Sequence, residues 1–200
     1  MADPAGDRRQ IRAEDLLSNE AFEAIRSETY QSLRPRKALR RVAVGPYATF
    51  YFECYDTMWW QIHEMLRIEK GGAAQIDDEL AAYNPLIPQG RELVATFMIE
   101  IDDPVRRARE LVQLGGIEDA VALVCGDAVV AAVPEDDVER TNAAGKTSSI
   151  HFLHFPMTAA AMAQFKNADA ECQLRIRHAA YGHAAILADT TRRELIGDLE

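Results

Sequence analysis

The stretch TFYFECYDTMWWQIHEMLRIEK, from Thr49 to Lys70, contains an abrupt change of hydrophobic period. Up to Tyr55, Phe50 and Phe52 alternate with Tyr51 and Glu53, which is the period-two pattern of a strand with two partly covered faces. From Met58 onward the spacing is helical. The apolar arc of that helix comprises Met58, Trp59, Ile62, Met65 and Leu66, and the opposite face comprises Trp60, His63, Glu64 and Arg67. The stretch therefore predicts a strand followed at once by an amphipathic helix.

Two further elements follow directly. Ile76, Leu80 and Tyr83 have helical spacing in a short helix that Asp77 or Asp78 opens and that Pro85 stops at Asn84. After a stiff turn that ends at Gly90, the segment 92–102 alternates as a second strand.

The rest of the chain has similar signals. Ser18 is a predicted N-cap of a helix that Pro35 bends or ends, and Asp103 and Thr158 precede two more helices. Thr191 and Glu194 match a capping box for a terminal helix. The remaining predicted elements are a strand begun by Val42 and Val44, a hairpin in 120–133 that turns at Gly126-Asp127, a loop at 135–149, and strands at 149–155 and 172–178.

These elements predict an α+β fold in which a mainly antiparallel sheet of roughly five to seven strands is covered by helices. A doubly wound α/β fold is the alternative. We expect residues 1–10 to be a mobile N-terminal segment and residues 11–200 to form a single globular domain.

The net charge and the distribution of apolar residues exclude some classes of partner. The 200 residues have a formal net charge of -10 and a pI near 5.0, which argues against a nucleic-acid partner. The N-terminal residues form no apolar run, and no later stretch approaches the ~20 apolar residues of a membrane span. We therefore expect no membrane association and a cytoplasmic location.

The cysteines Cys54, Cys125 and Cys172 are far apart and form no CxxC pair. We expect reduced, mostly buried thiols, and no cysteine-ligated cluster or structural zinc site within the chain.

Several polar residues near the predicted core form a candidate site. Its members are Glu53, Gln61, Glu64, Arg67, Glu69, Glu79, Tyr83, His178 and Tyr181. Carboxylates beside a tyrosine or a histidine can perform acid–base chemistry or bind a metal, and the candidate ligands are Glu53, Glu64, Glu69 and His178, for iron, manganese or zinc. The alternative is that these groups are surface charges, salt bridges and a core histidine.

Glu69 has two interpretations of its own. In a regular helix its carboxylate would point toward the core, where it would need hydrogen bonds, a cation or a raised pKa. If Gly71-Gly72 ends the helix, Glu69 reaches water instead.

One concentrated basic patch precedes the strand at Val42. It consists of Arg34, Arg36, Lys37, Arg40 and Arg41. It is a candidate site for an anion or an acidic partner, and the alternative is a solvated helix end whose cations neutralise the chain's own acids.

With these residues identified, the chain resembles an uncharacterised bacterial family of about this size, known as a domain of unknown function. The matching pieces are Lys37 to Pro46, Phe52-Glu53, Gln61, Glu64 to Arg67, Glu69, Glu79, Tyr83 to Pro88, Ala95-Thr96, Glu100-Ile101, Ile150 to Phe155, His178, Tyr181 and Leu195 to Leu199. The family usually has proline after the histidine, where this chain has Ala179. Members look as if they are often encoded beside rubrerythrin-like and iron–sulfur oxidoreductase-like proteins, which are therefore the implied partners.

Three functional hypotheses follow. The resemblance implies an accessory or binding protein for a redox or oxidative-stress system of iron–sulfur or diiron proteins, docking through the basic patch or the Trp59-Trp60 helix. The second hypothesis is a metal-binding protein or enzyme with a carboxylate and histidine site. The third is a polar core that only specifies the structure.

Overall fold

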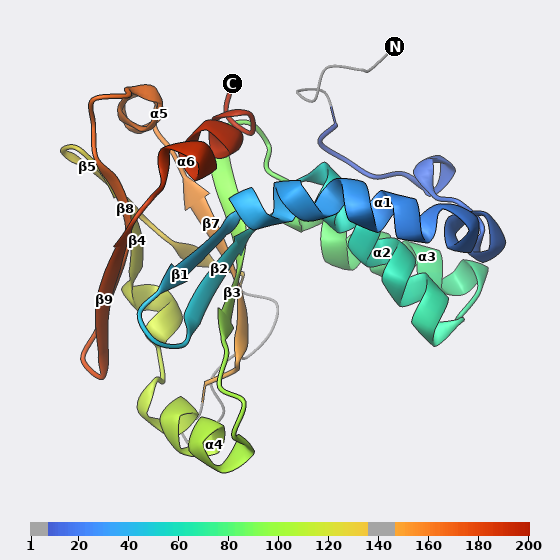
Figure 1. Cartoon of the computed structure of the whole chain (residues 1–200), viewed down its shortest axis with the longest axis horizontal. Helices are drawn as coiled ribbons and strands as arrows, with labels where there is room; N and C mark the ends of the chain where they lie inside the picture. Colours follow the sequence, from blue (N-terminus) through green and yellow to red (C-terminus); the bar gives the residue numbers. More distant parts are fainter. Residues whose placement is uncertain (1–7, 136–146) are drawn as a thin grey trace.

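The computed structural model describes residues 8–135 and 147–200 (Figure 1). The N-terminal segment expected to be mobile and the predicted loop at 135–149 lie largely outside this part of the chain. The elements in order are η1 (Ala13–Asp15), α1 (Asn19–Leu39), β1 (Arg41–Val44), β2 (Ala48–Phe52), α2 (Tyr55–Glu69), α3 (Ala73–Tyr83), η2 (Asn84–Leu86), β3 (Glu92–Ile99), α4 (Pro104–Gln113), η3 (Ile117–Ala120), β4 (Val121–Cys125), β5 (Ala128–Ala131), β6 (Val133–Pro134), β7 (Ile150–Pro156), α5 (Ala159–Lys166), β8 (Cys172–His178), β9 (Tyr181–Ile186) and α6 (Asp189–Ile196).

The described strands form two antiparallel sheets, so the predicted α+β class is confirmed. The first sheet has the order β1-β2-β3-β7-β6, and the second has the order β5-β4-β8-β9. The expectation of a single sheet is wrong, because the 120–133 hairpin pairs with β8 rather than with β3. The doubly wound alternative is also wrong, since it requires parallel neighbours and every pairing between the described strands is antiparallel.

The main core lies between the two sheets. Phe50 and Phe97 are cross-strand partners on the inner face of the first sheet, and their rings stack 4.6 Å apart. Leu123 and Leu174 pair in the same way on the second sheet. All four side chains belong to one buried cluster, so the two inner faces close on each other as in a sandwich.

The outer face of the first sheet meets the helices α1, α2 and α3, which extend to one side of the sheets (Figure 1). Met58, Ile62 and Leu66 of α2 form a second core with Val94 of β3 and Ile87, so the predicted apolar arc does pack inward. The predicted polar face is partly wrong, because Trp60 and His63 are buried too. Helix α1 covers that face, with Phe22 contacting both rings.

Short-range sequence signals predicted several helix starts and one hairpin turn correctly. The side chains of Ser18, Asp103 and Thr158 each accept a hydrogen bond from the backbone N–H of the residue three positions later, as N-caps do. The hairpin turn at Gly126-Asp127 is present, and Gly126 has φ +53°.

Several predicted boundaries are wrong. Helix α1 does not end at Pro35, one of the two predicted outcomes, but continues to Leu39. Helix α3 begins at Ala73 and not at Asp77 or Asp78, and the N-cap of α6 is Ala188, so no capping box forms at Thr191. Strand β2 ends at Phe52, so Glu53 lies in the two-residue link to α2.

The cysteines show one clear departure from expectation. All three are buried, as predicted, but Cys125 and Cys172 form a disulfide and are not reduced thiols. They are 47 residues apart in sequence yet directly opposite each other in the register of β4 and β8. Cys54 remains a buried free thiol.

None of the helices described here has the length and apolarity that crossing a membrane requires.

Candidate functional site

A cavity of about 440 Å³ lies where helices α1 to α3 meet the outer face of the first sheet. Its apolar walls come from both sides, from Met58 on α2 and Leu86 in η2, and from Met98 on β3 and Phe152 on β7. Polar side chains also line this cavity: Lys37, Arg40, Tyr51, Glu53, Thr57, Gln61, Tyr83 and Thr96. We call it the Glu53 cavity.

Glu53 is the buried carboxyl group of this cavity, with 8% of its surface exposed. Its Oε2 accepts a hydrogen bond from the Thr57 hydroxyl at 2.6 Å, and its Oε1 accepts one from the Thr96 hydroxyl at 2.7 Å. Burial raises the pKa of Glu53, and the two threonine hydrogen bonds together with the cations of Lys37 and Arg40 oppose that rise. Glu53 is thus a carboxyl group whose charge is costly and which a bound donor or cation would help to ionise.

The two cations at the cavity differ in their surroundings. Arg40 is 1% exposed and forms a bidentate pair with Asp198, with Nη2–Oδ1 at 2.6 Å and Nη1–Oδ2 at 3.0 Å. Lys37 is half-buried one helical turn earlier and acts electrostatically on Glu53. Arg40 is therefore largely neutralised inside the protein, whereas Lys37 contributes charge to the cavity.

Tyr83 is affected both by Glu53 and by a second group of polar residues. Burial is the largest cause that raises the pKa of Tyr83, a hydrogen bond with Gln61 lowers it, and the charges of Glu79, Glu69 and Glu53 raise it further. The structure thus brings five of the nine predicted site residues into one neighbourhood.

Gln75, which the sequence analysis did not select, links two of those carboxylates. Its Nε2 donates to Glu79 Oε1 at 2.8 Å and to Glu69 Oε2 at 2.9 Å. Glu79 is buried, while Glu69 is the last residue of α2 and is exposed, so the interpretation in which it reaches water is confirmed.

Glu64 and Arg67 lie elsewhere on α2, facing α1. Arg26 of α1 donates to both oxygens of Glu64, at 2.6 and 3.0 Å, and Arg67 donates to Glu64 at 3.4 Å. The Arg26 hydrogen bond is the largest cause that lowers the pKa of Glu64. These residues form an interhelical ion-pair network.

His178 and Tyr181 belong to the second sheet and do not line the Glu53 cavity. The His178 Nε2 lies 3.2 Å from the carbonyl oxygen of Gly115. The Tyr181 hydroxyl donates to the Val44 carbonyl at 2.7 Å and accepts from the backbone N–H groups of Tyr47 and Ala48. Tyr181 therefore fixes the β1–β2 turn against β9.

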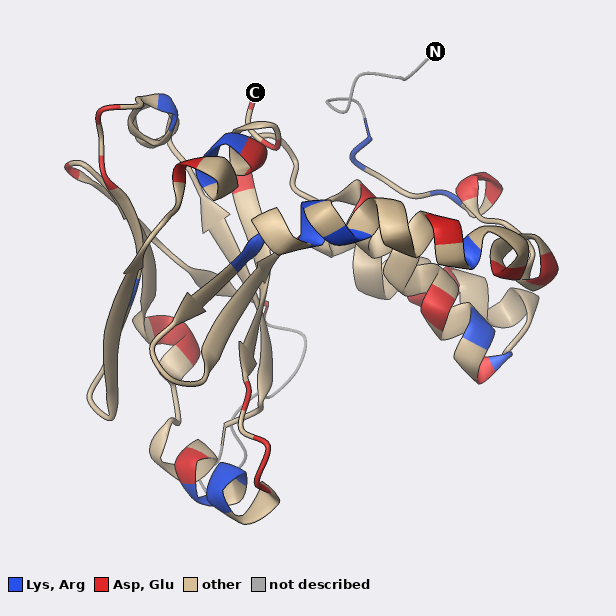
Figure 2. Cartoon of the chain, in the orientation of Figure 1, with Lys and Arg blue, Asp and Glu red and all other residues tan. Residues whose placement is uncertain are grey.

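The basic patch is divided among separate ion pairs where α1 meets the sheets (Figure 2). Arg36 pairs with Asp56 and Glu194, Arg40 pairs with Asp198, and Arg41 contacts Glu100. Arg34 is exposed. Most of these cations neutralise the chain's own acids.

A second, more open hollow of about 940 Å³ lies between the N-terminal segment and the helices. Its basic lining residues are Arg8, Arg9, Arg12 and Arg36, and its aromatic ones are Tyr55 and Trp59. Asp15 and Asp56 also line it. We call it the arginine groove.

No three His, Cys, Asp or Glu side chains within residues 8–135 and 147–200 lie close enough together to hold one metal ion. The four candidate ligands are distributed over the cavity, the α1–α2 contact, the end of α2 and the second sheet. Iron, manganese or zinc binding stays a prediction.

Thr57 and Thr96, the hydrogen-bond partners of Glu53, are two further residues that the sequence analysis did not select. Thr57 follows Glu53 by four residues, about one helical turn. That spacing from a carboxylate is the sequence pattern that could have identified Thr57. Thr96 is opposite Tyr51 in the register of β2 and β3, which no local pattern reveals.

The architecture and the cavity can now be compared with known proteins. The family model Protein of unknown function (DUF3501) matches residues 10–199. The chain belongs to this family. The crystal structure of a novel protein of unknown function from Burkholderia pseudomallei K96243 is similar to this chain: the two are 37% identical, the match covers 96% of this chain and 100% of the other, and the TM-score is 0.88. No curated protein matches the chain. The family membership expected from the sequence is confirmed, whereas the redox gene neighbours of DUF3501 members stay a prediction.

Proposed function

We propose that the protein binds a small molecule in the Glu53 cavity. The observation that carries this proposal is a buried carboxyl group facing a cavity of about 440 Å³ that has apolar walls on both sides. That volume is within the range of small-molecule sites, and a few polar groups in a mostly apolar cavity are the usual arrangement of such sites.

The polar residues define the ligand class. Glu53 would accept a hydrogen bond from an amine or amide of the ligand, and Lys37 would contact an acceptor or a carboxylate. Met98, Ile150 and Phe152 would cover an apolar body. Apolar α-amino acids and their amides are the simplest molecules that combine a donor, an acceptor and an apolar body.

The test is calorimetric titration with leucine, phenylalanine, their amides and the corresponding acids without an amino group. The amino compounds should bind, and Glu53→Gln and Lys37→Met should each weaken binding by about tenfold or more. Glu28→Gln on the exposed face of α1 is the matched control and should bind normally. Equal binding by wild type and Glu53→Gln would refute the assignment of Glu53.

If the ligand donates a hydrogen bond to Glu53, its binding should also release a proton that calorimetry can detect. Because an amine favours the ionised carboxyl group, binding should release a proton from the fraction of Glu53 that is protonated. The measured binding enthalpy should then depend on the ionisation enthalpy of the buffer, and this dependence should vanish in Glu53→Gln.

An accessory role toward iron–sulfur or diiron redox proteins is a second proposal. The arginine groove supports it, since Arg36 of the basic patch and Trp59 both line this open surface. Arginines beside aromatic rings suit an acidic partner. Arg8→Glu combined with Arg12→Glu should abolish micromolar binding to a purified rubrerythrin-like or iron–sulfur protein, and the absence of binding by the wild-type chain would reject this role.

A further inference from the structure

The outer face of the second sheet has no described segment packed over it (Figure 1). Its outward residues are Ala122, Val124, Val129, Ala131, Gln173, Arg175, Arg177, Gly182, Ala184 and Ile186. None of them is buried, and Val129 and Ile186 expose 61% and 66% of their surfaces. We call this surface the outer β8 face.

The residues of this face are mostly small or apolar and lie in cross-strand rows. One row is Val129, Val124, Gln173 and Ile186, and the next is Ala131, Ala122, Arg175 and Ala184. None of the outward positions in these rows carries a carboxylate, although the chain as a whole is acidic.

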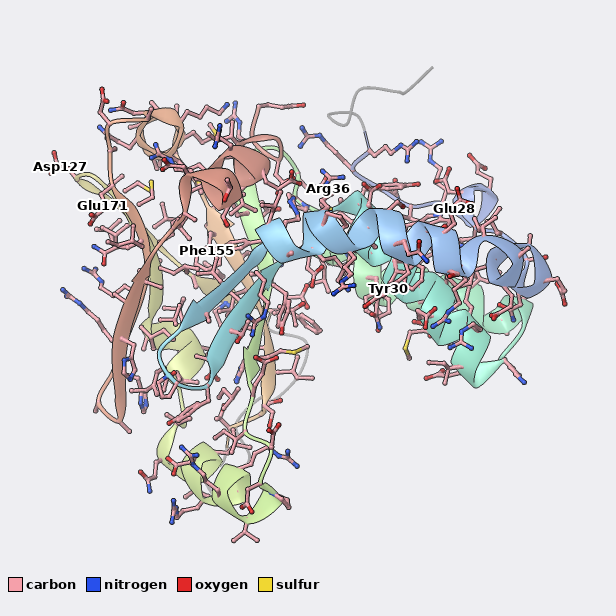
Figure 3. All side chains as sticks on the ribbon, in the orientation of Figure 1. Glu28, Tyr30, Arg36, Asp127, Phe155 and Glu171 are labelled. Carbon is pink, nitrogen blue, oxygen red and sulfur yellow. A yellow bond between two sulfur atoms is a disulfide. The ribbon has the colours of Figure 1, made fainter. Side chains whose placement is uncertain are left out.

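The charges around the face are separated along strand β8. Glu171 precedes the strand, and Asp127 in the β4–β5 turn lies at the same end (Figure 3). Both are exposed. Arg175 and Arg177 project from the middle and the other end of the strand, and among the described residues neither forms an ion pair with a carboxylate. The buried Nε of Arg175 also has no hydrogen-bond acceptor in this part of the chain.

We propose that the outer β8 face binds the same face of a second copy of this chain. A two-fold axis that lies in the contact plane and runs across the strands would place each β8 antiparallel over the β8 of the other copy. Arg177 would then face Glu171, and Arg175 would face Gln173, whose side-chain oxygen is an acceptor. The apolar rows would cover each other as in aligned sheet packing.

The outer β8 face is small for a protein–protein contact. Four strands about 4.8 Å apart and seven residues of about 3.3 Å each give roughly 400 Å² per copy. Stable interfaces bury about 800 Å² per partner. We therefore expect a weak dimer, with a dissociation constant on the order of 100 µM.

The test is sedimentation velocity of the full chain between about 10 µM and 1 mM, with a charge exchange across the interface. Arg177→Glu alone places like charges opposite each other twice per dimer, as does Glu171→Arg alone, and each should weaken association about tenfold or more. The double variant R177E/E171R restores opposite charges and should return the dissociation constant to within about threefold of the wild-type value.

A second pair of variants tests the apolar rows. Ile186→Glu should abolish association, whereas Val105→Glu, at an exposed valine on α4, should leave it unchanged. Circular dichroism checks that each variant is folded, and Val129→Glu replaces Ile186→Glu if that variant unfolds. A chain that is monomeric at 1 mM, or a dimer that none of the face variants weakens, would overturn the proposal.

Discussion

Two threonine hydroxyls hold the Glu53 carboxyl group in position, yet burial of its charge reduces the stability of the fold. Its buried carboxyl group has a raised pKa in the folded protein. The unfolded chain therefore releases this proton at lower pH than the folded chain does, so folding becomes less favourable as the pH rises from the unfolded pKa toward the folded one.

The matching prediction concerns Glu53→Gln, which keeps the shape and removes the charge. At pH 7 it should raise the free energy of unfolding, and at pH 4, below the ordinary pKa of a glutamate, the difference between variant and wild type should be smaller. Urea unfolding at both pH values measures this. A variant that is less stable than wild type at pH 7 would mean that the threonine hydrogen bonds to the carboxylate outweigh its desolvation.

At the level of single residues, the sequence predicted only part of the candidate site. Glu53 stood out because it sits among aromatics at the end of a strand pattern, but its partner Thr96 did not, since its position opposite Tyr51 depends on strand register. His178 was grouped with the carboxylates because its parity is apolar, yet parity does not say which sheet a strand joins.

Elements are joined by a few buried or half-buried ion pairs, and the pair of Arg40 and Asp198 is the most enclosed of those described. It ties the end of α1 to the turn that follows α6. Asp198→Asn would leave the guanidinium of Arg40 buried without its carboxylate and should lower the free energy of unfolding by about 3 kcal/mol. Asp78→Asn on the exposed side of α3 is the control and should change it by less than about 0.5 kcal/mol. Chemical denaturation measures both, and equal stabilities would show that Glu194 compensates.

His154 makes the end of the β3–β7–β6 ladder sensitive to pH. Its Nδ1 lies 3.0 Å from Glu92 and its Nε2 lies 3.5 Å from Glu135, and the Glu92 hydrogen bond is the largest cause that raises its pKa. The resulting stability is fully present below the unfolded pKa of about 6.5 and is lost as the pH rises through the folded pKa.

His154→Gln should therefore destabilise the protein by about 0.5–1 kcal/mol at pH 6 and by less at pH 9. Thermal unfolding at the two pH values, with His183→Gln at an exposed position of β9 as the control, checks the sign. A loss that grows with pH would contradict it.

Helix caps and the hairpin turn were predictable, because each depends on residues close in sequence. Two helical features were not. Pro35 is exposed, so the backbone carbonyl that its missing N–H leaves unpaired can bind water, and α1 continues. Trp60 and His63 were assigned to a polar face because the approach of Phe22 is a tertiary contact.

The whole molecule depends on pairings between distant segments. Strand β7 joins β3 and strand β8 joins β4, each across a long stretch of intervening chain, and this is why the sequence predicted the antiparallel class but not the division into two sheets. The same pairings bring Cys125 and Cys172 together.

The disulfide gives a prediction at this scale. It closes a loop of 47 residues between the two central strands of the second sheet, so its reduction should lower the free energy of unfolding by about 2–4 kcal/mol. The melting temperature should fall on addition of dithiothreitol, and Cys54→Ala should show the same fall. A wild-type melting temperature that does not respond to the reductant would indicate that the two thiols remain unlinked in solution.

The position of the Glu53 cavity also bears on how the protein opens. The helices α1 to α3 pack on the outer face of the first sheet and contribute little to the sandwich core. We therefore expect them to separate from the sheets as one cooperative unit without unfolding the rest. A molecule in the cavity would contact the helices and strands β2, β3 and β7 at the same time, so it would have to leave before this separation occurs. Occupancy should consequently slow hydrogen exchange of the α2 and α3 amides as a group, by the same factor for each, while the amides of β8 and β9 exchange as before.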